Sequence, residues 1–64
     1  MTVLQCREIA HKTQEEMAKM LGITLEEYSV YEQYPFVMPI HIAVCFSEIV
    51  MIPCDHIFFG ANSI

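Results

Sequence analysis

The sequence contains no lysine or arginine after Lys19. Its three cationic residues stand against eight Asp and Glu, which gives a formal net charge of −5 at pH 7. Residues 23–64 carry acids only, namely Glu26, Glu27, Glu32, Glu48 and Asp55. Because a basic patch cannot form from the last two thirds of the chain, ordinary electrostatic binding to phosphate backbones or anionic membranes is disfavoured.

Cysteine is scarce as well, and the three present, Cys6, Cys45 and Cys54, are an odd number. An odd number makes a poor disulfide framework, so we expect reduced cysteines in a cytoplasmic protein. His41 with Cys45, and Cys54 with His56, have spacings that zinc accepts. The 41/45 pair lies in a predicted core helix, however, and neither half is a Cys-x-x-Cys knuckle. We therefore expect no metal and no cofactor.

The chain of 64 residues is long enough for one domain only. A domain of this size buries only about 60% of the surface of its unfolded chain, so its stability is marginal and a large catalytic pocket is excluded. A hydrophobic fraction of 55% excludes intrinsic disorder. We predict a single domain over residues 1–64, with a core over about 3–60, that is not an enzyme.

The stretch 34–54 resembles a membrane span because its only formal charge is Glu48. Three prolines, Pro35, Pro39 and Pro53, interrupt this stretch, and no Lys or Arg flanks it. The sequence therefore predicts a protein that does not enter the membrane.

The first half of the chain carries strong local helix signals. Residues 3–11 suit a short helix with Leu4 and Ile9 on its buried side. Thr13-Gln14-Glu15-Glu16 and Thr24-Leu25-Glu26-Glu27 are both capping boxes, and Gly22 between them is a natural left-handed helix end. Two capped helices around so short a turn predict a helix-turn-helix, with Met17, Ala18 and Leu21 buried in its first helix.

The second half predicts two further helices. Pro39 suits the start of a helix over 40–50, and a short last helix is expected over 54–59. The helix over 40–50 is apolar almost all round, whereas one domain covers only one of its faces. We therefore expect a homodimer whose interface includes the following apolar side chains: Phe36, Val37, Ile42, Phe46, Phe58 and Phe59.

These motifs together resemble the phage repressor/Cro-type helix-turn-helix domain, also called the XRE family. The resemblance rests on Arg7, on TQEEMAKMLGIT over 13–24, on Tyr31-Glu32 and on IPCDHIFFG over 52–60. It implies an all-α, compact, lambda-repressor-like bundle of five helices that binds double-stranded DNA as a homodimer, with the third helix in the major groove. Such a protein would act as a transcription regulator or repressor.

The resemblance also implies roles for particular residues. Arg7 and Glu32 match a structural ion pair between the first and third helices, and Gln14 matches a phosphate contact. The residues that the resemblance implies would contact DNA are Gln14, Thr24, Leu25, Glu26, Glu27, Val30 and Gln33.

Three features depart from the family pattern. Leu25, Glu26, Glu27 and Val30 stand where family members usually present basic or amide side chains, Tyr34 replaces a glycine, and the following basic loop is apolar. Glutamate can accept from cytosine and an aliphatic can contact thymine, but paired carboxylates repel phosphates. Acids in a first helical turn also have a purely structural explanation. The alternative function is an acidic scaffold that has lost ordinary DNA binding and acts on a basic protein partner, as an antirepressor, inhibitor or partial DNA mimic.

Overall fold

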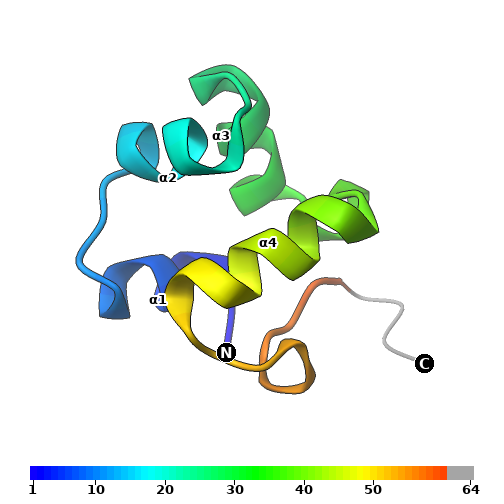
Figure 1. Cartoon of the computed structure of the whole chain (residues 1–64). Helices are drawn as coiled ribbons and strands as arrows, with labels where there is room; N and C mark the ends of the chain where they lie inside the picture. The colour runs from blue at the N-terminus through cyan, green and yellow to red at the C-terminus, as the bar shows by residue number, and fades with distance from the viewer. Residues whose placement is uncertain (61–64) are drawn as a thin grey trace.

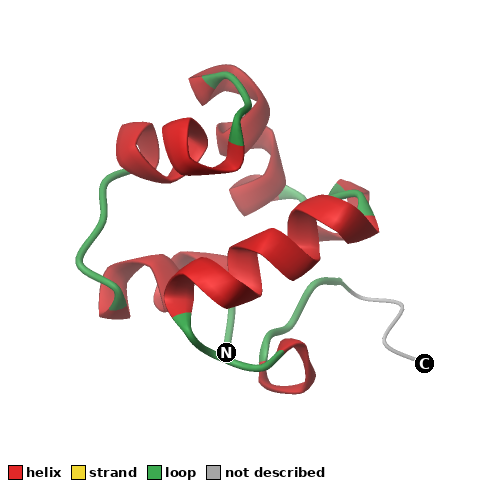
Figure 2. Ribbon diagram, viewed as in Figure 1, coloured by secondary structure: helices red, strands yellow, loops and turns green. Residues whose placement is uncertain are grey.

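Four α-helices are arranged around one core in the computed structural model, which describes residues 1–60 (Figure 1). They are α1 (Val3–Ile9), α2 (Gln14–Leu21), α3 (Leu25–Gln33) and α4 (Ile40–Val50). Two single turns of 3-10 helix follow α3 and α4, η1 (Pro35–Val37) and η2 (Cys54–His56). Within residues 1–60 the regular structure is helical apart from one bridge pair (Figure 2). The expected all-α class is therefore correct.

Three threonines start the first three helices in the same way. The hydroxyls of Thr13 and Thr24 accept from the backbone N–H groups of Glu16 and Glu27 at 3.1 and 3.0 Å, and both glutamates accept from the threonine N–H in return. Both predicted capping boxes are confirmed. Thr2 with Gln5 forms a third box, at the start of α1, that the sequence reading missed.

The turn between α2 and α3 is closed by Gly22. Its φ of 74° is left-handed, and the N–H of Ile23 reaches back to the carbonyl of Ala18 at 3.0 Å. A side chain on the residue at this φ would be strained, which explains why glycine is present. Only Gly22, Ile23 and Thr24 separate the two helices, so α3 leaves α2 at a sharp, fixed angle.

The core lies where α4 packs on α1 and α2. Its largest fully buried side chains are Tyr28, Phe46, Met17, Val3 and Cys6. Met17 and Ala18 are buried, as expected for α2, whereas Leu21 is only half-buried.

The first helix forms within the predicted range, but the prediction of its buried side was wrong. That helix ends at Ile9 and buries Val3 and Cys6, whereas Leu4 and Ile9 are exposed. The spacing of apolar residues in so short a helix fits more than one face, and packing against α4 selects the face that carries Val3.

Helix α4 uses only one of its apolar faces for the core. Ile42, Ala43, Phe46 and Val50 are buried. Ile42 and Phe46 were expected in a dimer interface, and that prediction was wrong because both already pack inside a single chain.

The expected fifth helix over 54–59 is also not formed. After the single turn η2 the chain is extended, Ile57 is buried, and Phe58 pairs with Thr2 in a parallel bridge. The ring of Phe59 packs edge-on against Phe46, with 6.5 Å between centroids. Figure 1 shows the segment that carries η2 beside the start of the chain. Backbone pairing with Met1 and Thr2 therefore replaces the helical bonds that this segment would otherwise make.

We predict that Gly22→Ala lowers the free energy of unfolding by about 1 kcal/mol, because no other atoms crowd the site and only the left-handed φ is strained. Urea unfolding followed by circular dichroism measures this loss. Gly22→Asn is the matched control, since asparagine tolerates this φ better and should lose less. An unchanged midpoint for Gly22→Ala would contradict the strain argument.

Candidate functional site

Helix α3 has one exposed face along its whole length. Leu25, Glu26, Ser29, Val30 and Gln33 are all exposed, and at 100° per residue they form a stripe about 140° wide. We call these five residues the α3 stripe. It contains four of the residues expected at DNA, and it carries no cation.

Two other residues expected at DNA belong to the helix cap instead. The Thr24 hydroxyl accepts from Glu27 N–H, and a Glu27 carboxylate oxygen lies 3.0 Å from Thr24 N. Both side chains are at the surface, but each already has a structural partner. Of the two acids in this turn, Glu26 is the one without a cap role.

The inner face of α3 holds the central polar feature of the molecule. The Glu32 carboxylate accepts hydrogen bonds from Arg7 Nε, from Gln14 Nε2 at 2.7 Å and from the Tyr28 hydroxyl at 2.7 Å. Arg7 forms an ion pair with Glu32 and also donates from Nη1 to the Lys12 carbonyl at 2.9 Å. These five residues are the Glu32 cluster. It joins α1, the α1–α2 connection, α2 and α3 through one carboxylate.

The cluster fixes the protonation states of its members. Burial by itself raises the pKa of Glu32, but hydrogen bonds from Arg7, Gln14 and Tyr28, together with the Arg7 charge, bring it below its ordinary value. Burial, and then the bond to Glu32, raise the pKa of Tyr28 above its ordinary value, so its hydroxyl stays a neutral donor. The bond to Glu32 raises the pKa of Arg7. At neutral pH Glu32 is therefore an anion, paired with the Arg7 cation.

The structure thus gives Gln14 and Arg7 roles inside the chain. The ion pair expected between Arg7 and Glu32 is present, with only 15% and 8% of the two side chains exposed. Gln14 was expected to contact a phosphate. It donates one of its two amide N–H groups to Glu32, and the second N–H remains available. Lys12 and Lys19 are then the remaining cationic side chains of the chain.

The sequence reading missed the Tyr28 hydroxyl and the Gln14–Glu32 bond. The spacing of four residues between Tyr28 and Glu32 is the signal that predicts their contact, because positions i and i+4 lie one above the other on a helix.

The loop after α3 is apolar and exposed, as its sequence suggests. Phe36 and Val37 of η1 are about half exposed, and the Tyr34 ring meets Phe36 edge-on with 6.1 Å between centroids. Met38 is buried and anchors this loop to the core. Phe58 is likewise exposed, whereas Phe59 is half-buried against the core.

Neither the cysteines nor the histidines gather into a site. Burial raises the pKa of the Cys6 thiol, while Cys45 and Cys54 are exposed and free. Over residues 1–60, no group of three His, Cys, Asp or Glu side chains is placed to hold a metal ion. In the same part of the chain, no helix is long and apolar enough to cross a membrane.

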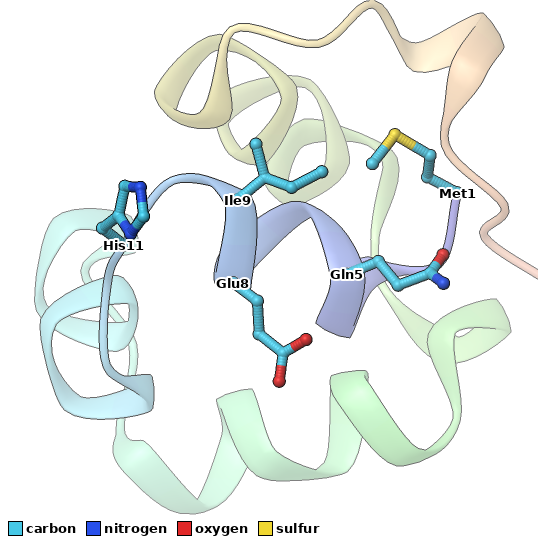
Figure 3. A pocket seen from close by; sticks show the side chains of 5 residues that line it. All are labelled: Met1, Gln5, Glu8, Ile9 and His11. Atoms are coloured by element: carbon cyan, nitrogen blue, oxygen red, sulfur yellow. The ribbon is translucent and has the colours of Figure 1, made fainter.

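An open hollow of about 580 Å³ lies along α1. Met1, Gln5, Glu8, Ile9 and His11 line it. Figure 3 shows these side chains pointing in different directions, with Glu8 and Ile9 turned away from each other. Because no donors or acceptors converge there, this hollow is a weaker candidate site than the α3 stripe.

We predict that Glu32→Gln lowers the free energy of unfolding by about 2–3 kcal/mol at pH 7, because it leaves the partly buried Arg7 charge without its partner. The lowered pKa of Glu32 means that its contribution is complete above its ordinary value of 4.5 and is lost as the pH falls through the folded-state pKa. The difference between parent and variant should therefore shrink below about pH 4. Urea unfolding across pH 3–7 measures both effects.

Glu26→Gln is the matched control, since it makes the same change on the exposed face of the same helix. It should change stability by only a few tenths of a kcal/mol. Equal losses in the two variants would show that the Glu32 cluster does not hold α3.

Comparison with protein-family models, with curated proteins and with solved structures finds no match to this chain. The function proposed below therefore depends on the placement of the chain's own residues.

Proposed function

We propose that this protein is a small cytoplasmic transcription regulator of the repressor/Cro type, which binds double-stranded DNA as a homodimer. In this proposal α2, the turn at Gly22 and α3 act as a helix-turn-helix, and α3 enters the major groove. The observation that carries it is the α3 stripe, which stays exposed while Tyr28 and Glu32, on the adjoining side of the same helix, hold α3 against the rest of the chain.

The α3 stripe has the chemistry to read base edges. Glu26 can accept from the amino group of cytosine, Gln33 can bond adenine at two atoms, and Val30 can contact the methyl group of thymine. These side chains are spaced three or four residues apart, so they follow one groove. The resemblance to the repressor/Cro family supports the same placement.

Phosphate contacts would be few. The second amide N–H of Gln14 is available for one, and Lys12 and Lys19 supply the remaining positive charge. Because Arg7 is held by Glu32, two lysines per chain limit the dependence of log affinity on log salt to a slope of about −4 for a dimer. We therefore expect weak non-specific binding and a high ratio of specific to non-specific affinity.

Selection of duplexes from a random pool at low salt tests this proposal. We expect one sequence to be enriched, and fluorescence anisotropy should give that duplex a salt slope no steeper than about −4. Glu26→Gln should lower affinity for the selected duplex by about 1–3 kcal/mol while leaving a scrambled duplex unaffected.

Glu26→Lys adds positive charge at the groove and should strengthen binding to a scrambled duplex, for which the Glu26 acceptor is not needed. Asp55→Lys is the charge-matched control, because η2 lies at the opposite end of the molecule from α3 (Figure 1). The control should strengthen binding much less. Selection that enriches no sequence, or equal effects of the two lysines, would overturn the DNA proposal.

A second candidate is an acidic protein-interaction module that occupies the basic surface of another protein. It is favoured by Leu25 and Val30, which are 42% and 45% exposed beside Glu26 in a stripe without cations. In this case selection fails, whereas an amphipathic peptide of leucine and lysine binds the parent and loses affinity with Glu26→Lys.

A further inference from the structure

Helix α4 carries a second surface stripe that the core and the proposed DNA face do not use. Ile40 and Val44 are 81% and 44% exposed, and His41, Cys45 and Glu48 are exposed beside them. At 100° per residue these five side chains span about 140°, opposite the buried face that carries Ile42 and Phe46. We call them the α4 stripe.

Four residues of the α4 stripe, His41, Val44, Cys45 and Glu48, are symmetric about the point midway between Val44 and Cys45. His41 lies three and a half residues before this point and Glu48 the same distance after it. If a second α4 ran antiparallel across this point, His41 of each copy would lie at the height of Glu48 of the other. Val44 would meet Val44 on one side of the seam, and Cys45 would meet Cys45 on the other.

We propose that the α4 stripe is the interface for a second copy of this chain, packed antiparallel about a twofold axis between Val44 and Cys45. This inference deepens the homodimer proposed above, and its test needs no DNA. The stripe matches itself in both shape and polarity, as a twofold interface requires. Two chains of net charge −5 repel, but here Glu48, the single acid of each α4 stripe, meets a histidine of the other chain.

The size of the surface sets the strength expected of this dimer. A helix of 11 residues is about 16 Å long, which is short for the roughly 800 Å² that each partner of a stable complex buries. Phe36, which is exposed and lines one hollow together with Ile40, extends the apolar surface at the start of α4. We therefore expect a dissociation constant on the order of tens of micromolar, which is weak for a specific dimer.

The proposal also places the two Cys45 residues within reach of each other. Packed helices lie about 8–10 Å apart, which puts the Cys45 Cα atoms about 5–7 Å from each other across the axis. Disulfides span Cα distances of about 4.4–6.8 Å. An added oxidant such as diamide would therefore join two chains, taking up two electrons and the two thiol protons as the sulfur–sulfur bond forms.

The chain supplies its own cysteine controls. Cys54 is also exposed, and Cys6 is buried. With diamide at 50 µM protein, Cys54→Ser should still give a covalent dimer on a non-reducing gel, whereas Cys45→Ser should give little. Equal crosslinking through Cys54, or none through Cys45, would overturn the antiparallel arrangement.

Sedimentation equilibrium without DNA tests the same interface without cysteine chemistry. His41→Glu places two glutamates face to face and should weaken the dimer by about tenfold or more. Adding Glu48→Lys to that variant restores opposite charges and should recover dimerisation, which a merely misfolded variant would not do. A parent that remains monomeric at 200 µM, or a double variant that fails to recover, would overturn the proposal, whatever the outcome of the DNA experiments.

Discussion

The arrangement of the first three helices depends on the carboxylate of Glu32. A buried anion is costly unless donors surround it, and here the donors come from α1, α2 and α3 itself. Arg7 extends the connection to the Lys12 carbonyl, so the chain between α1 and α2 is held as well. In a domain too small for a large core, a directional polar contact fixes the orientation of α3 more tightly than apolar packing alone does.

The hydrogen bonds to Glu32 also affect the charge of the surface around α3. Arg7 and Gln14 are both suited to bind an anion, and both donate to Glu32. Holding α3 in place therefore removes positive charge from the face that α3 presents. Any recognition by the α3 stripe must depend on its hydrogen-bonding atoms and apolar contacts, because long-range attraction is lacking.

Local signals in the sequence predicted the start and end of α2 and the start of α3, since a capping threonine and a left-handed glycine act within a few residues. The Arg7–Glu32 pair followed from family resemblance. Contacts between distant segments were not predictable in the same way. The buried face of α1 and the extended chain around Phe58 depend on packing between the two ends of the described chain. For α4, a nearly uniform apolar pattern could not show that Ile42 and Phe46 face inward while Val44 faces outward.

The α3 and α4 stripes lie on different helices joined by η1, so one surface can be occupied without covering the other. This separation matters for a chain with few cations. A single α3 would gain little affinity from phosphates, but linking two of them makes the second contact intramolecular and multiplies the affinity without adding charge. The uncharged centre of the α4 stripe suits that linkage because two acidic chains can approach there with the least repulsion. In this arrangement the dimer would bind DNA more tightly than the monomer, whose acidic surface gains little from phosphate contacts.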